Sequence, residues 1–131
     1  MRELIIRTRQ REEFIDMTER IHSAVRESGV TAGIVLIQSP HTTLAVTANE
    51  NADPDVVRDA LAHLATMVPR SSAFRHREYN SDSHIKVSIV GPSLALVVEQ
   101  GRMQLGTWQG IFACEFDGPR ERRLWVQVVG Q

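Results

Sequence analysis

The sequence lacks several features that would place it in a familiar class of protein. It has one cysteine, Cys114, which excludes an internal disulfide and fits a reducing compartment. No apolar run approaches the ~20 residues that cross a bilayer, and the N-terminus has no signal-peptide core. The formal net charge of -1 gives no general attraction to nucleic acid or to an anionic membrane. We therefore expect a cytoplasmic protein that binds neither.

Length and pattern predict one domain that spans residues 1–131, with 42% hydrophobic and 24% charged residues. Apolar residues at helical spacing predict a helix from about Phe14 to a C-terminus at Gly29. Asp53 and Pro54 are typical of an N-cap and first turn, so capping is the favoured role of Asp53, and the helix should end at Pro69. Apolar runs predict about seven strands, among them 33–38, 84–89 and 124–129. The fold class is α+β with about two helices.

The stretch 39–55 joins a buried strand to the second helix. If it is extended, its side chains alternate between two faces. One face is apolar, with Leu44 and Val46 in the core. The other is small and largely polar, and consists of His41, Thr43, Ala45, Thr47, Asn49 and Asn51. Such a row indicates either an ordinary solvated face or the wall of a polar pocket.

Three histidines, His41, His76 and His84, lie on or beside the candidate pocket elements. Three imidazoles with a free position are a familiar zinc site, although their spacing matches no compact ligand motif. Carboxylates that could complete or replace such a site are Glu50, Asp82 and Glu115. A divalent metal, zinc or magnesium, is one prediction, and structural histidines are the alternative.

Anion binding is the competing use of the same residues. His41, Thr42 and Thr43 offer an imidazole and two hydroxyls, and Lys86 and Arg120 could add positive charge. The predicted strand 84–89 turns Lys86 and Ser88 to its polar face, which makes a second candidate wall. The sequence contains neither standard Gly-rich phosphate loop, and no nucleophile has an evident base of its own.

Five ordered blocks together resemble the YjbQ-like family, often labelled secondary thiamine-phosphate synthase enzymes. They run through nearly the whole chain and comprise His41-Thr42-Thr43, Asn49 to Val56, Ser83 to Lys86, Leu105 to Gln109 and Glu115 to Arg120. Two departures stand out: Tyr79-Asn80-Ser81-Asp82-Ser83 lacks one carboxylate that the family often has there, and Ala48 replaces a larger aliphatic residue.

The resemblance implies a sandwich-like α+β fold and a homotrimer, with a metal or anion site that draws on His41, His76, His84 and Glu115. The implied reaction joins a pyrimidine methyl diphosphate to a thiazole phosphate and releases pyrophosphate. On this interpretation His41, Glu50 and Asn51 are the catalytic candidates. The candidates for binding a small phosphorylated substrate are Thr42, Thr43, Lys86, Ser88 and Arg120.

A non-catalytic trimer that binds a metal or a small anion is the alternative function. The residues alone do not select between the two, since nothing in them specifies a thiazole or a pyrimidine. The trimer has some independent support, because the apolar strand 125–129 is a large surface for so small a domain to cover alone.

Overall fold

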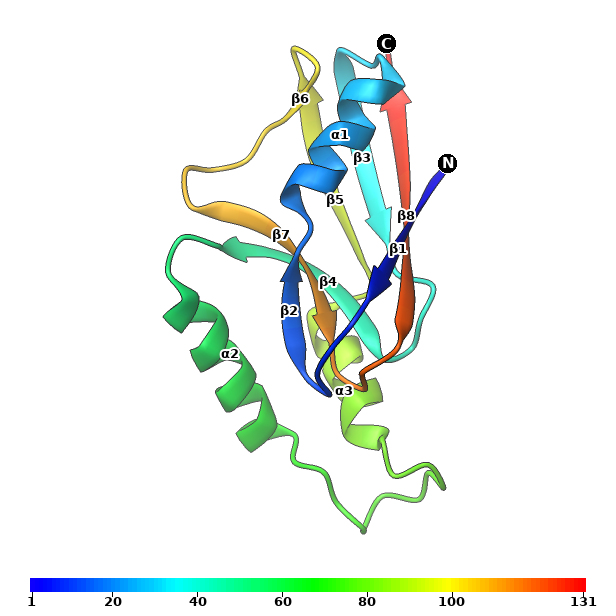
Figure 1. Ribbon diagram of the computed structural model, residues 1–131, viewed down its shortest axis with the longest axis vertical. Coiled ribbons are helices and arrows are strands. Elements are labelled where there is room, and N and C mark those ends of the chain that lie inside the picture. The colour runs from blue at the N-terminus through cyan, green and yellow to red at the C-terminus, as the bar shows by residue number, and fades with distance from the viewer.

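Two antiparallel sheets form the body of the molecule, and the computed structural model describes residues 1–131 (Figure 1). The large sheet has the strand order β1-β8-β3-β5-β6, and the small sheet has the order β2-β7-β4. The strands of the large sheet are β1 (Arg2–Arg7), β3 (Ala32–Gln38), β5 (Ser93–Glu99), β6 (Arg102–Met103) and β8 (Glu121–Gly130). Those of the small sheet are β2 (Glu13–Asp16), β4 (Leu44–Glu50) and β7 (Gln109–Glu115). The predicted α+β class is confirmed.

Three helices accompany the sheets, one more than the sequence predicted: α1 (Thr18–Ser28), α2 (Pro54–Met67) and α3 (Ser81–Val90). The predicted capping of α2 is confirmed, because the Asp53 side chain accepts a hydrogen bond from the Asp55 N–H and Pro54 occupies the first turn. The predicted end of α1 is also confirmed, with Gly29 in the left-handed conformation at φ 74°. None of the three helices is long and apolar enough to span a membrane.

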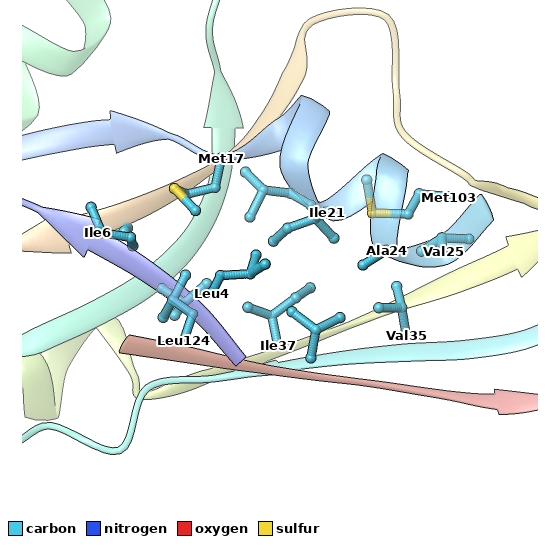
Figure 2. Packing of buried hydrophobic residues seen from close by; sticks show 14 of the residues in the cluster. Leu4, Ile6, Met17, Ile21, Ala24, Val25, Val35, Ile37, Met103 and Leu124 are labelled. Carbon is cyan, nitrogen blue, oxygen red and sulfur yellow. The ribbon is translucent and has the colours of Figure 1, made fainter. Parts of the chain in front are cut away.

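The main core lies between the two sheets and α1 (Figure 2). Met17, Ile21 and Val25 reach it from α1 and the residue before it, and they meet Ile37 of β3 and Leu124 of β8. The inward side chains of β3 and β8 alternate with outward ones, as expected of half-buried strands. The strand predictions at 33–38 and 124–129 are confirmed, but 33–38 was expected to be a buried strand and β3 is buried on one face only.

A second, smaller core lies on the other face of the small sheet. It shows that the prediction of one continuous polar face from His41 to Asn51 is wrong. Ala45 is fully buried there with Val87 of α3, Phe112 and Phe116, and half-buried side chains of α2 pack against them. Both faces of the first half of β4 are therefore covered. The row from His41 to Asn51 is interrupted by this packing and does not line one continuous pocket.

The predicted strand at 84–89 is wrong, because these residues belong to α3. The inward positions of α3 are Asp82, Ser83, Lys86 and Val87, which follow a helical period. Ile85 and Ile89 lie outside, and Ile89 is 53% exposed. The apolar residues at 85, 87 and 89 therefore alternate by coincidence, while polar residues of the helix are buried.

The predicted start of the first helix at Phe14 is wrong as well. Phe14 and Ile15 belong to β2, where they pair with Cys114 and Ala113 of β7. The helix begins only after Asp16, whose side chain accepts hydrogen bonds from the backbone N–H and the hydroxyl of Thr18. The short strand was missed because its apolar residues also fit the helical spacing of α1.

The outer face of the large sheet carries no helix. Ile34 and Leu36 of β3, Val97 of β5 and Val129 of β8 point away from the core and are exposed. Ile34 lies between Val97 and Val129 in the strand register, so the three form one row across the sheet. Val97 and Val129 are 58% and 63% exposed.

Candidate functional site

A polar pocket of about 440 Å³ opens at one end of the small sheet. Ten of its eleven lining residues are polar or charged and the eleventh is Pro40, so the pocket suits a polar ligand. The register of β4 and β7 explains why its parts meet there. Leu44 pairs with Glu115, which brings the connection before β4 beside the connection after β7. The N-terminal end of α3 and the loop before it complete the wall.

Arg122 forms the floor of this pocket, although its side chain comes from the core face of β8. The residue is only 3% exposed, and its Nε donates to Glu115 Oε1 at 2.8 Å. Its Nη2 donates to Glu115 Oε2 and to Thr43 Oγ1, the latter at 2.7 Å. Nη1 has no protein acceptor and is not enclosed by other atoms, so it is the part of the guanidinium that faces the pocket.

Arg120 presents a second free guanidinium nitrogen at the same pocket. Its Nε donates to the Asp117 carbonyl at 2.6 Å, and its Nη2 donates to Asp117 Oδ2 at 2.8 Å. Asp117 is also held by Asn80, whose Nδ2 donates to the same carboxylate oxygen at 2.7 Å. Nη1 of Arg120 remains without a protein partner. The pocket therefore has two arginines that carboxylates hold in place, each with donors to spare.

His41 is fixed in one tautomer by the backbone of β8. Its Nε2 accepts a hydrogen bond from the Arg123 N–H at 2.9 Å, so the neutral ring carries its proton on Nδ1. Burial, followed by the positive charge of Arg122, holds the pKa of His41 below its usual value. The ring is therefore neutral at pH 7, and it can donate a hydrogen bond from Nδ1 but has no free lone pair.

This tautomer bears on the predicted metal site. All three histidines line the pocket, as the sequence predicted, and the ring centroids of His76 and His84 lie 5.2 Å apart. The molecule nevertheless contains no group of three or more His, Cys, Asp or Glu side chains arranged to hold a metal ion. A neutral imidazole has one lone pair, and that of His41 is bound to the backbone. The three residues therefore do not fit a three-histidine metal site.

Two of the catalytic candidates lie far from this pocket. Glu50 pairs with Gln109 at the opposite end of the β4–β7 ladder from Leu44 and Glu115. At about 3.3 Å per residue, the strand between them spans roughly 20 Å. Asn51 follows directly and donates from its Nδ2 to Asp16 Oδ2 at 3.0 Å. Within a single chain, Glu50 and Asn51 are therefore too far from His41 for all three to contact one small ligand.

The predicted substrate-binding residues divide in the same way. Thr42, Thr43 and Arg120 line the polar pocket, but Lys86 does not. Its ammonium lies between Glu12 Oε1 at 3.1 Å and Asp82 Oδ2 at 3.4 Å, and its side chain is 1% exposed. Ser88 lies on the exposed side of α3, where its hydroxyl donates to the His84 carbonyl. Lys86 is therefore a structural cation in this fold.

Sequence reasoning missed Arg122, Asn80 and Asp117 as pocket residues. No local signal marks Arg122, because it lies in the charged run Arg120-Glu121-Arg122-Arg123 at the start of β8. Its burial depends on the ion pair with Glu115 of β7, a strand of the other sheet, since a charge is rarely buried unless it is paired. The interruption at Glu115 was recognised from the sequence, but its partner on the last strand was not.

Comparison with known proteins finds one family across the chain. The family model described as UPF0047 protein YjbQ-like matches residues 2–131. UPF0047 protein MJ1081 of Methanocaldococcus jannaschii is 50% identical over 125 residues, which cover 95% of this chain and 91% of that protein. UPF0047 protein YugU of Bacillus subtilis is 46% identical over 131 residues, or 99% of both chains.

The fold is also that of a solved member of the family. The crystal structure of a YjbQ/UPF0047-family protein from Clostridium acetobutylicum matches with a TM-score of 0.97 and 45% identity. The match covers 98% of this chain and 100% of that one. The chain therefore belongs to the YjbQ-like UPF0047 family.

Proposed function

We propose that the protein binds a small phosphorylated molecule in the polar pocket, with the phosphate against the free Nη1 of Arg122. The observation that carries this proposal is a buried guanidinium whose Nε and Nη2 edge is held by both oxygens of Glu115, while its Nη1 has no protein acceptor at the pocket. Arginine suits phosphate because its planar donors match the phosphate oxygens. The Glu115 pair also fixes the guanidinium before a ligand arrives, which lowers the ordering cost of binding.

Three further donors surround the same space and support an anionic ligand. Arg120 offers its Nη1, His41 its Nδ1–H, and Thr42 a hydroxyl without a protein partner. None of the three has to be released from another contact before it can bind. A phosphate group, with several acceptor oxygens, can use more of these donors at once than a carboxylate can.

Calorimetric titration with inorganic pyrophosphate tests this proposal. Arg120→Gln should weaken binding at least tenfold, because it removes a donor that touches the anion. Arg58→Gln is the matched control, since Arg58 also pairs with a carboxylate three residues earlier, Asp55, but lies on α2. Absence of binding to the wild-type protein at millimolar pyrophosphate, or an equal loss in both variants, would contradict the proposal.

The reaction that the resemblance implies is a further proposal for the same pocket. A ring nitrogen of the thiazole forms a bond to the methylene carbon of the pyrimidine, while the carbon–oxygen bond breaks and diphosphate leaves with the electron pair. The protein supplies no nucleophile for this step. Cys114 could not serve as one, because burial raises the pKa of its thiol. The donors of the pocket would stabilise the departing diphosphate.

A pyrophosphate-release assay separates this enzyme from a non-catalytic binder. We expect release when both substrates are present and none when the thiazole phosphate is omitted. If pyrophosphate binds in the calorimeter but no release occurs with both substrates, the non-catalytic alternative is correct. The assay is run with and without magnesium, because a divalent cation also neutralises a leaving diphosphate.

Metal binding stays a prediction, and His76 and His84 are its remaining candidate ligands. Their rings are near enough to bind one ion together, and no backbone N–H occupies a ring nitrogen of either residue as the Arg123 N–H occupies Nε2 of His41. Titration of the protein with zinc tests this pair. Uptake should be abolished by His84→Gln and unchanged by His41→Gln, whereas loss in His41→Gln would restore the three-histidine site.

The homotrimer is also proposed, with the outer face of the large sheet as its contact surface. The row of Ile34, Val97 and Val129 gives an apolar strip that a second copy can cover. Whether Glu50 and Asn51 have a role at the polar pocket also depends on this assembly. These residues can act on a ligand of the polar pocket only if they come from a neighbouring copy.

A further inference from the structure

The connection from α2 to α3 is nearly independent of the body of the molecule. It is the green segment at the lower end of the molecule in Figure 1, and we call residues 69–79 the strap. Every hydrogen bond of the strap stays within it, for example the bond from the Tyr79 N–H to the His76 carbonyl. Arg70 joins its two ends, because Nε donates to the Tyr79 carbonyl at 2.9 Å. The strap is therefore a closed loop that can move as one unit on its two attachments.

The strap nevertheless forms part of the wall of the polar pocket. His76 and Glu78 line this pocket, and the ring of His76 packs edge-on against that of His84 on α3, with the two centroids 5.2 Å apart. A movement of the strap therefore changes the pocket directly.

Two unfavourable features meet where the strap joins α3. Tyr79 has a φ of 58°, in the left-handed region that a bulky side chain rarely adopts. Asn80, which follows, is 5% exposed, and its Nδ2 donates to Asp117, so its Oδ1 is buried without a partner. An asparagine at this N-cap position usually accepts from a helix N–H, but Asn80 does not. Local strain of this kind is typical of segments that change conformation, and a rotation at this junction can release it.

The strap also carries unpaired positive charge beside the pocket. It contains three arginines and one carboxylate, Glu78, in a chain whose formal net charge is -1. Its side-chain contacts involve Arg70 and the pair of His76 and Glu78, whereas Arg75 and Arg77 have no protein partner. These two arginines flank His76, so their Cα atoms lie about 3.8 Å from that of a residue in the pocket wall. A small movement therefore brings their guanidinium groups to the pocket.

We propose that the strap closes over an anion in the polar pocket and adds Arg75 and Arg77 to the groups that bind it. This inference rests on the phosphate site proposed above and goes beyond it, since neither arginine lines the pocket in the present arrangement. A ligand shifts a conformational equilibrium only when it binds one state more tightly than the other. A bound phosphate supplies this difference, because it repels Glu78 and attracts the two arginines. Closure also excludes water, which strengthens these charge interactions.

Limited proteolysis with trypsin, which cleaves after arginine and lysine, tests the closure on the wild-type chain. Exposed loops are cut before ordered elements, so the first cuts in the free protein should follow Arg75 and Arg77. Saturating inorganic pyrophosphate should slow these cuts at least tenfold. A short arginine-containing peptide, digested with and without pyrophosphate, controls for inhibition of trypsin itself. Cuts that are as fast with pyrophosphate as without it would overturn the closure.

A double variant, Arg75→Gln with Arg77→Gln, tests the two donors. Calorimetric titration should show pyrophosphate binding at least tenfold weaker than in the wild-type protein. The control combines Arg26→Gln with Arg102→Gln, which changes the net charge equally at a separate hollow beside α1 and β6. This control should bind pyrophosphate as the wild type does. Circular dichroism confirms that both double variants are folded before they are titrated.

The outcomes separate the closure from the phosphate site. If the wild-type protein does not bind pyrophosphate, the phosphate site is wrong and the closure falls with it. If it binds, and the strap variant binds equally well, the phosphate site stands and the closure is overturned. An equal loss in the two double variants also overturns the closure, because the effect is then one of overall charge.

Discussion

At the scale of single residues, the pocket depends on a buried ion pair, Glu115 and Arg122, in which both carboxylate oxygens accept hydrogen bonds. Glu115 accepts from Arg122 through both of its oxygens, from the Thr8 hydroxyl at 2.8 Å, and from the Asp117 N–H at 3.1 Å. A buried pair is tolerated only when its remaining polar atoms are satisfied in this way. The one donor group left over, Nη1 of Arg122, faces the pocket. Nη1 is therefore free to bind a ligand because the other polar atoms of the pair already have protein partners.

His41 should contribute to stability in a way that depends on pH. Its pKa is lowered on folding, so the unfolded chain takes up the proton first as the pH falls. The contribution of His41 is therefore complete above an ordinary histidine pKa of about 6.5 and is lost as the pH falls from there to the lower folded pKa. In His41→Gln a side-chain oxygen can still accept from the Arg123 N–H, but this residue does not titrate.

Urea denaturation at pH 7.5 and pH 5.5 measures this effect. The wild-type protein should lose more stability between the two pH values than His41→Gln does, since all other titrating groups are shared. His41→Ala should cost about 0.5–1.5 kcal/mol at pH 7.5 through the lost hydrogen bond, and should weaken pyrophosphate binding at least tenfold. An identical pH response in wild type and His41→Gln would show that the ring is not held as described.

At the scale of elements, α3 is held to the rest of the fold by charges. Asp82 accepts from Arg11 at 3.1 Å and from Lys86 at 3.4 Å, and Lys86 also reaches Glu12. Burial alone would raise the pKa of Asp82, but the hydrogen bond and charge of Arg11, followed by those of Lys86, hold it below its usual value. This network positions the first turn of α3, which carries His84 into the polar pocket.

Asp82→Asn should therefore destabilise the protein by about 3 kcal/mol, because it leaves the buried Lys86 with only one carboxylate partner. The measurement is urea denaturation at pH 7. Asp59→Asn is the control, since Asp59 is exposed on α2, and its effect should stay within about 0.5 kcal/mol. Equal effects of the two substitutions would mean that the charges of α3 do not anchor it.

The same helix shows why part of the fold could not be predicted from the sequence. The start of α2 was readable because Asp53 and Pro54 act within one turn of the helix. The strand at 33–38 was readable because its apolar residues form one short local run, Ile34 to Ile37. The buried positions of α3 include two charged residues, Asp82 and Lys86, and Arg11, which pairs with Asp82, lies 71 residues away in the chain. A local pattern of apolar residues cannot indicate burial that depends on so distant a partner.

The candidate site was also predicted only in part. His41, His76 and His84 were predicted to converge, and they line one pocket. His41 follows the predicted strand 33–38, whereas His84 lies within α3, a helix that the sequence did not predict. Arg122 was missed because its burial depends on Glu115 in a neighbouring part of the fold, and no local pattern reveals that pairing. Lys86 was misassigned because the predicted strand over residues 84–89 hides its pairing with Asp82 one helical turn earlier, and because its other partner, Glu12, is distant in the chain.

At the scale of the whole molecule, the uncovered face of the large sheet predicts assembly. Light scattering at micromolar concentration should give three times the 14.7 kDa mass of one chain. Val97→Asp places a charge in the middle of the apolar row and should give the monomer mass. Ala62→Asp, an exposed position on α2, is the control and should remain trimeric. A monomer mass for the wild-type protein would remove the trimer and, with it, any role of Glu50 and Asn51 at the pocket.

A crystal structure of the protein grown with inorganic pyrophosphate tests the central claim most directly, namely that the polar pocket is a phosphate site built on Arg122. The predicted result is a phosphate group in the pocket whose oxygens accept from Nη1 of Arg122 and Nη1 of Arg120 at about 2.7–2.9 Å. The Glu115–Arg122 pair should remain intact beneath it. A pocket that holds only water at a saturating pyrophosphate concentration, or a phosphate bound without contact to Arg122, would contradict the account.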